Sequence, residues 1–161
     1  MKKLVVFYSL GGNTKYIAES IAEAVDAEVL ELKRCREMKN SGFMKYVLGG
    51  RQAITGAKPE IEEIAIDFDA YDLIYFGTPV WASTLNPVFN TLFSNYKIHG
   101  KKVALFCCNR GNKGKTFIGM KEYLKGNNII GEIEFVEPII NKQEKATLAK
   151  NWAMDIEKEI L

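Results

Sequence analysis

The chain is short of the residue types that build metal centres and catalytic triads. Its 161 residues include one histidine and three cysteines. The cysteines at 35, 107 and 108 make neither an even disulfide framework nor a C-x-x-C metal spacing. His99 is the sole histidine and the carboxylates show no catalytic grouping, so we assign no Ser/His/Asp or Cys/His arrangement. These shortages argue against a structural metal and against nucleophilic catalysis of either kind.

Long apolar runs and an excess charge of one sign are also missing. After Met1-Lys2-Lys3, only residues 4–8 form an apolar run before Ser9, which is too short for a signal peptide or a membrane span. The 22 basic and 20 acidic residues leave a net charge of +2 and are spread through the chain, so no strong field attracts nucleic acid or an anionic membrane. We therefore expect a cytoplasmic protein that binds neither.

The composition and the apolar patterns predict one α/β domain spanning 1–161. The chain is 47% hydrophobic and 26% charged, which suits one globular domain with a sizeable core. Apolar spacing predicts strands at 3–8, 28–32, 69–77, 103–108 and 129–136, and helices at 15–26, 41–55, 85–96, 117–124 and 149–160. The last strand is expected at a partly wetted edge. Such alternation predicts a parallel sheet covered on both faces, with its ligand beyond the carboxyl ends of the strands.

The turn after the first strand has the composition of an anion site. It reads Ser9-Leu10-Gly11-Gly12-Asn13-Thr14 and leads directly into a helix. Free N–H groups and the positive end of the helix dipole favour a phosphate, while glycine lets the backbone approach it closely. Lys15 is an optional further charge. A tight turn with an N-cap is the structural alternative. The adjacent glycines do not fit the dinucleotide pattern G-x-G-x-x-G.

The turn after the third strand combines a rigid proline with a large aromatic residue. Thr78-Pro79-Val80-Trp81 is followed by the small residues Ala82 and Ser83, so a flat apolar ligand could stack there. Such stacking contributes about 1–3 kcal/mol per aromatic contact. Trp81 as a core residue, or as a surface for a partner, is the alternative.

The turn after the fourth strand is a basic loop that approximates, but does not match, a nucleotide P-loop. Position 109 is Asn109 where G-x-x-x-x-G-K-[ST] requires glycine, so we predict a solvated basic loop instead. Cys107 and Cys108 precede this loop at the end of a strand. Neighbouring strand residues point to opposite faces, so we expect the two thiols on opposite faces of the sheet. Free cysteines are more often small core residues than nucleophiles, so we also predict that both are packed in the core.

Together these turns resemble the flavodoxin family over nearly the whole chain. The first turn is similar to the family's FMN phosphate loop, and Asp69 to Trp81 is similar to the third strand and the flavin-stacking loop, a match that continues through Asn86-Pro87-Val88. The third turn resembles the loop whose backbone binds the pyrimidine edge of the flavin. The resemblance implies a three-layer flavodoxin-like sandwich, with a five-stranded parallel sheet in the order 2-1-3-4-5 and helices on both faces.

The resemblance also implies one non-covalently bound FMN. The residues that it assigns to FMN are Ser9, Leu10, Gly11, Gly12, Asn13, Thr14, Thr78, Pro79, Val80, Trp81, Ala82, Cys108, Asn109, Arg110, Gly111 and Gly114. Many flavodoxins cover the second flavin face with a tyrosine in the third turn, which this sequence lacks. We expect that face to be open, or covered from elsewhere, with the helix near Phe43, Met44 and Tyr46 as a candidate lid.

The function that the resemblance implies is low-potential electron transfer, because bound FMN carries the redox chemistry and no catalytic side chain is required. Redox partner proteins, with donor and acceptor unidentified, and a monomer or weak dimer are expected. Two alternatives stay open: an NAD(P)H-dependent quinone or flavin oxidoreductase on the same fold, and a non-flavin nucleotide- or protein-binding module. Flavodoxins are typically strongly acidic, whereas this chain is slightly basic. We expect Arg110, Lys113 and Lys115, if near the flavin, to favour its anionic reduced form.

Overall fold

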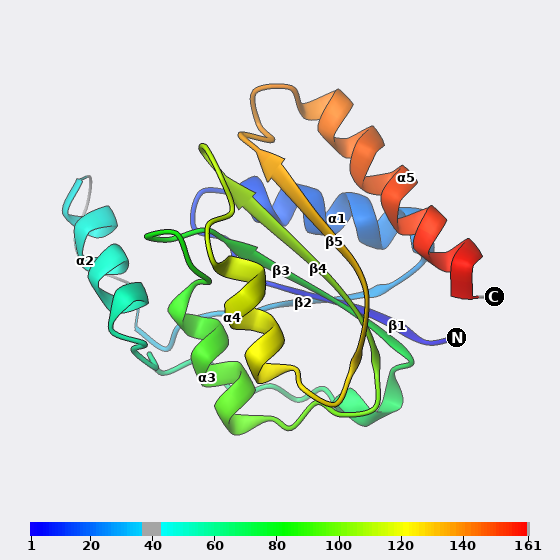
Figure 1. Cartoon of the computed structure of the whole chain (residues 1–161), viewed down its shortest axis with the longest axis horizontal. Helices are drawn as coiled ribbons and strands as arrows, with labels where there is room; N and C mark the ends of the chain where they lie inside the picture. The colour runs from blue at the N-terminus through cyan, green and yellow to red at the C-terminus, as the bar shows by residue number, and fades with distance from the viewer. Residues whose placement is uncertain (37–42, 161) are drawn as a thin grey trace.

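A five-stranded parallel sheet forms the middle layer of the protein, in the order β2-β1-β3-β4-β5, as expected. The structure, a computed structural model, describes the backbone of residues 1–36 and 43–160 and the side chains of all these residues except 43–46. The strands are β1 (Lys3–Phe7), β2 (Glu28–Glu31), β3 (Leu73–Pro79), β4 (Lys102–Asn109) and β5 (Asn128–Val136). The helices are α1 (Asn13–Val25), α2 (Phe43–Ile54), α3 (Pro87–Asn95), α4 (Thr116–Tyr123) and α5 (Lys142–Ile160). All five strands point toward the same edge (Figure 1).

Two apolar cores lie on the two faces of this sheet. Helices α1 and α5 cover one face, and α3 and α4 cover the other (Figure 1). The central strands are buried on both sides, which explains why they read as unbroken apolar runs. Within β4, Cys107 packs on the α3/α4 side and Cys108 on the α1/α5 side. Both predictions for these cysteines are confirmed, and burial raises the pKa of each thiol to about 12.

The sheet also explains a glycine in the middle of a buried strand. A Cβ on Gly77 of β3 would lie 1.9 Å from Cζ of Phe106 on β4, so the phenyl ring occupies the space that a side chain would need. The outer strand β5 is largely half-buried, which confirms the expected wetted edge. Among the described ranges, no helix is long and apolar enough to cross a membrane.

Several element boundaries differ from those expected. The strand predicted from residue 69 begins at Leu73, because Asp67 accepts a hydrogen bond from the Asp69 N–H and folds Phe68–Ala70 into a 3₁₀ turn. Helix α3 begins at Pro87 rather than 85, since the preceding asparagine is its cap. Helix α5 begins at Lys142 rather than 149, because its polar first turns are mostly exposed and carry no apolar period. The start expected for the second helix, 41–42, lies outside the described residues.

The crossover from β2 to β3 runs beyond the carboxyl edge of the sheet before it returns. Helix α2 stands off that edge beside the loop that follows β3, instead of lying flat on a sheet face (Figure 1). The returning chain pairs antiparallel with the segment after β2: Cys35 N–H donates to the Glu60 carbonyl, and Glu62 N–H donates to the Lys33 carbonyl. These hydrogen bonds place α2 at the edge where the three predicted turns emerge.

Candidate functional site

The three predicted turns meet at the carboxyl edge of the sheet because β1, β3 and β4 are neighbours. Phe7 pairs with Gly77, and Pro79 pairs with Cys108, so the strands end almost level. The Val80 N–H then donates to the Cys108 carbonyl at 2.9 Å, which carries the pairing into the turns. The structure thus brings all the predicted site residues to one edge: 9–14, 78–82, 108–111 and 114.

The first turn presents an uncapped helix N-terminus. Gly12 precedes α1 in the left-handed region, at φ 85°, and no described side chain caps the helix. The Gly12 N–H donates to Ser9 Oγ at 3.1 Å, which closes the turn. A Cβ on Gly11 or Gly12 would meet no atom of the described chain within 4 Å, and both glycines are exposed. An anion can therefore approach the free N–H groups at the positive end of the helix dipole.

A buried hydroxyl in the same turn lacks a partner. Thr14 is 1% exposed, and its Oγ1 makes no hydrogen bond of standard geometry in the described part of the chain, although it lies close enough to the Cys108 thiol to oppose the rise in pKa that burial causes there. Leaving such a group unpaired costs about 1–3 kcal/mol. Asn13 Oδ1 accepts a hydrogen bond from the Ile139 N–H at 3.3 Å and so ties the turn to the loop after β5. The turn therefore has free N–H donors and the open space that a phosphate group requires.

Lys15, the optional extra charge, already has an ionic partner. Its Nζ lies 3.2 Å from Glu31 Oε2 at the end of β2. Both side chains are partly exposed, so the pair is weakly stabilising. The glutamate reduces what Lys15 adds to the potential at the first turn.

The second turn is a tight reversal with two strained residues. Trp81 and Thr84 exchange backbone hydrogen bonds of 2.9 and 3.0 Å, while Ala82 and Ser83 between them have φ of 47° and 62°. Left-handed conformations cost non-glycine residues about 1–2 kcal/mol each. Ala82 and Ser83 thus both adopt a backbone conformation that is costly for residues other than glycine.

The third turn holds the second in place. The Lys115 N–H donates to the Ser83 carbonyl at 2.7 Å. Gly114 has a φ of 53°, and a Cβ there would lie 2.4 Å from the same carbonyl oxygen. Only a residue without a side chain allows this approach. The contact explains how the sheet edge keeps two left-handed residues in the second turn.

Three predicted site residues in the second and third turns, Thr78, Cys108 and Asn109, also have their side chains engaged within the protein. The Thr78 hydroxyl accepts from the Asn86 N–H and donates to the Pro79 carbonyl. Asn109 Nδ2 donates to Glu134, and its Oδ1 accepts from the Gly111 N–H. Cys108 points into the α1/α5 core. At these positions the backbone, rather than the side chain, is what a ligand at the edge can reach.

Trp81 is half-buried among groups that sequence reasoning missed. The Tyr8 ring meets it edge-on, with the centroids 6.2 Å apart, and the Arg34 guanidinium lies 5.7 Å from its ring centroid. Gly49 of α2 lies against the outer edge of its six-membered ring: a Cβ there would be 2.4 Å from Cζ3. No signal marked Arg34, but two successive glycines inside an amphipathic helix are a signal of close packing. The candidate lid side chains, Phe43, Met44 and Tyr46, lie outside those described.

The loop after β4 is exposed and basic, as predicted. Arg110, Lys113 and Lys115 are all exposed. Lys113 Nζ lies 5.6 Å from the Phe117 ring centroid, so this cation is held near the base of the loop by a cation–π contact. The three cations create a positive potential beside the second turn.

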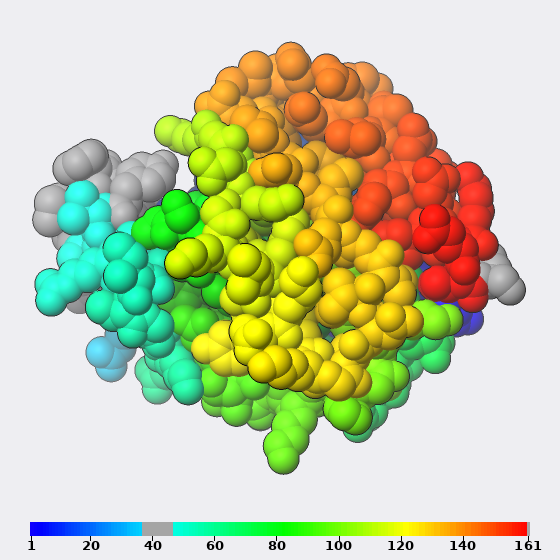
Figure 2. All heavy atoms as spheres, viewed as in Figure 1, coloured from blue at the N-terminus to red at the C-terminus, as the bar shows by residue number. Residues whose placement is uncertain are grey.

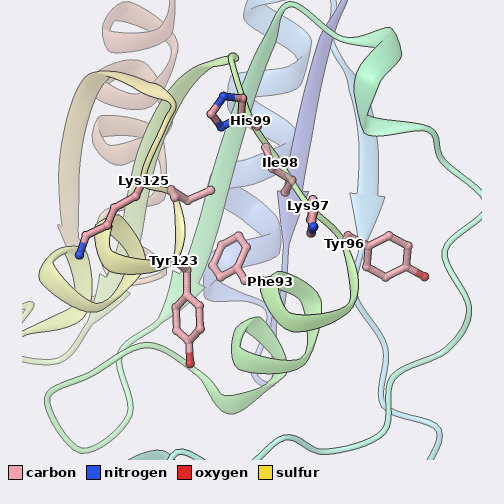
Figure 3. Close-up of a pocket in the computed structure, with 8 residues that line it drawn as sticks. Phe93, Tyr96, Lys97, Ile98, His99, Tyr123 and Lys125 are labelled. Atoms are coloured by element: carbon pink, nitrogen blue, oxygen red, sulfur yellow. The ribbon is translucent and has the colours of Figure 1, made fainter.

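A separate hollow of about 280 Å³ lies at the opposite edge of the sheet (Figure 3). In Figure 3 the Phe93 and Tyr123 side chains lie next to each other on its wall. Their rings are stacked, with the centroids 5.6 Å apart. His99, also on its wall, is packed on the backbone of Gly126. None of the predicted site residues lines this hollow.

Comparisons with known proteins agree with the fold and the edge described above. The sequence matches the family Flavodoxin over residues 2–156. A flavoprotein from Lactobacillus acidophilus NCFM, solved in complex with FMN, is 31% identical; the match covers 87% of this chain and 97% of that one, with a TM-score of 0.72. Oxidised Flavodoxin 2 from Bacillus cereus is 20% identical, with 99% of each chain covered and a TM-score of 0.63, which shows a shared fold.

One curated relative is longer than this chain. The flavodoxin-like domain-containing protein BilS from Clostridioides difficile (strain CD3) is 28% identical over 137 residues, or 81% of this chain. The matched region spans 63% of the length of that protein.

Proposed function

We propose that this chain, which belongs to the flavodoxin family, holds one FMN at the carboxyl edge of its sheet and transfers electrons between partner proteins. When bound, FMN supplies the redox chemistry, and the protein supplies its orientation and electrostatic environment. The solved relative from Lactobacillus acidophilus that carries FMN supports the choice of cofactor. No side chain need act as an acid or base for this function.

The observation that carries the proposal is the buried, unpaired hydroxyl of Thr14 in an uncapped helix N-terminus. We assign residues 9–14 to the phosphate group, where backbone N–H groups and Thr14 donate to it. We assign Trp81 to one side of the flavin ring. The backbone of the third turn, around Arg110 and Gly111, is assigned to the ring's polar edge.

The charge distribution supports a partner with an acidic face. The chain carries only +2 overall, but the loop after β4 carries Arg110, Lys113 and Lys115 on exposed positions. The exposed Lys33 and Arg36 lie beside the exposed Glu60 and Glu62, whose charges offset theirs. A cluster of one sign steers an oppositely charged partner to the same edge and makes the association rate fall with salt. We expect the protein to act in the cytoplasm as a monomer or weak dimer.

An FMN titration of matched valine variants tests the proposal. Thr14→Val keeps the shape of the side chain and removes the hydroxyl, while Thr116→Val makes the same change at another buried hydroxyl without a partner among the described residues. A hydrogen bond to a charged group is worth about 1.5–3 kcal/mol, so Thr14→Val should weaken FMN binding about 10- to 100-fold. Thr116→Val should leave the affinity unchanged.

The outcomes separate the proposal from its competitors. Fluorescence quenching of FMN by the wild-type protein, lost in Thr14→Val alone, supports the assignment. A wild-type protein that purifies without flavin and shows no spectral change with FMN would refute it and favour the non-flavin binding module. Steady NAD(P)H oxidation with a quinone as acceptor would replace electron carriage by the oxidoreductase alternative.

A further inference from the structure

We propose that helix α2 packs against Trp81 and fixes the orientation of its indole ring. Gly49 is then a positioning residue for the flavin, because its missing side chain lets α2 contact the indole. This inference rests on the proposed function, since it concerns how the flavin-stacking residue is held. Helix α2 stands off the carboxyl edge (Figure 1), and its cyan atoms adjoin the green atoms that follow β3 (Figure 2).

Helix α2 contacts the second turn through Gly49 and Gly50. A Cβ on Gly49 would lie 2.4, 2.7 and 3.1 Å from three ring carbons of Trp81. A Cβ on Gly50 would lie 3.8 Å from Cβ of Ala82, which is an ordinary van der Waals distance. The two glycines therefore differ sharply: the first makes a contact that no other residue permits, and the second does not.

Arg34 joins the same assembly from the other end of the crossover. Its guanidinium lies over Trp81, while Nη1 donates to Oε1 of Gln52 on α2 at 3.1 Å. Its Nε and Nη2 are buried without a hydrogen-bond partner in the described chain. Among the described residues, this guanidinium contacts the Trp81 ring and Gln52, and the cation–π contact offsets part of the cost of its incomplete pairing. Arg34 thereby links α2 to the indole.

Trp81 has little freedom as a consequence. Gly49 limits its outer edge, Arg34 lies over the ring, and Tyr8 meets it at an interplanar angle of 79°. The turn that carries it is also fixed through Ser83 and Gly114. An aromatic platform that is already ordered loses less conformational entropy when it stacks on a ligand, and binds it more tightly.

The experiment compares Gly49→Ala with Gly50→Ala. Both substitutions raise helix propensity equally, so any difference between them comes from the contact with Trp81. We expect Gly49→Ala to weaken FMN binding about tenfold and Gly50→Ala to leave it within about twofold of the wild type. The Trp152→Phe background leaves Trp81 as the sole indole, and its emission should shift in Gly49→Ala and not in Gly50→Ala.

A double-mutant cycle distinguishes positioning from general damage. Trp81→Phe removes the ring atoms that the new Cβ would meet, so in that background Gly49→Ala should change FMN affinity by less than about twofold. If Gly49→Ala does not fold, Gln52→Ala removes the α2 side chain that accepts the hydrogen bond from Arg34 and should still weaken FMN binding.

The experiments distinguish a failure of the proposed function from a failure of the role proposed for α2. A wild-type protein that does not bind FMN defeats the proposed function. A wild-type protein that binds FMN, together with equal affinities for the two glycine variants or an unchanged affinity in Gln52→Ala, overturns the role of α2 alone.

Discussion

Replacing Gly114 by alanine should release the second turn from the third and destabilise the protein. Two costs can be worked out from the structure. Gly114 has a φ of 53°, where a non-glycine residue costs about 1 kcal/mol or more. The new Cβ would also stand 2.4 Å from the Ser83 carbonyl oxygen, so the turns must separate and weaken the 2.7 Å hydrogen bond from Lys115, worth about 1 kcal/mol. The sum is about 2–3 kcal/mol.

Urea unfolding of the flavin-free protein, followed by far-ultraviolet circular dichroism, measures this loss. With a slope of about 2 kcal/mol per molar, the midpoint should fall by about 1 M or slightly more. Gly111→Ala is the matched control in the same loop. Its φ is not in the left-handed region, and its Cβ would meet no described atom within 4 Å. The control should change the free energy of unfolding by less than about 0.5 kcal/mol.

The same variants report on the cofactor edge. Saturating FMN stabilises the folded state by RT ln(1 + [FMN]/Kd), which is about 2.7 kcal/mol at a concentration of 100 times Kd. FMN should raise the midpoint of Gly114→Ala less than that of the wild type, because this variant displaces the turn that carries Trp81. Equal unfolding midpoints for Gly114→Ala and Gly111→Ala without flavin would refute the contact between the second and third turns, independently of any effect of FMN.

Two further predictions concern thiols and pH. In the native protein at pH 8, a thiol reagent should modify the exposed Cys35 and spare Cys107 and Cys108, because burial raises the pKa of both to about 12. The number of modified thiols per chain should be one in the native protein and three in denaturant. Rapid modification of more than one thiol in the native protein would contradict the packing. The hydrogen bond from Tyr71 lowers the pKa of Glu28, so this group stabilises the fold above its unfolded pKa and loses that effect as pH falls. The stability advantage of wild type over Glu28→Gln should therefore shrink from pH 6 to pH 3, and a constant difference would argue against it.

The order of the elements was predictable because their signals are local. The unbroken apolar run of β4 indicates a strand buried on both faces, and the period of α1 indicates a helix with one buried stripe. The errors came where local signals were weak. Residues 69–72 read Asp-Ala-Tyr-Asp and directly precede the apolar centre of β3, so nothing local separated them from the strand; the Asp67 cap folds the chain into a 3₁₀ turn before β3 begins.

The first turn shows how far composition reaches into the site. Its glycines and hydroxyl residues predict an anion site, and the structure adds that the buried Thr14 hydroxyl has no hydrogen-bond partner of standard geometry among the described residues. Composition does not reveal that Lys15 is paired with Glu31, since that depends on where β2 ends beside α1. Nor does it reveal that the side chains of Thr78 and Asn109 are already hydrogen-bonded within the protein.

The sequence by itself determined which segments form the sheet, which turns emerge together and which of them suits a phosphate. Periodicity and turn chemistry are properties of neighbouring residues, and parallel strands place their carboxyl ends at one edge. Only the tertiary structure decided that α2 packs against Trp81 and that Gly114 contacts the Ser83 carbonyl. Each of these contacts joins residues about 30 positions apart, where the fit of a missing side chain to a distant ring or carbonyl leaves no local pattern to read.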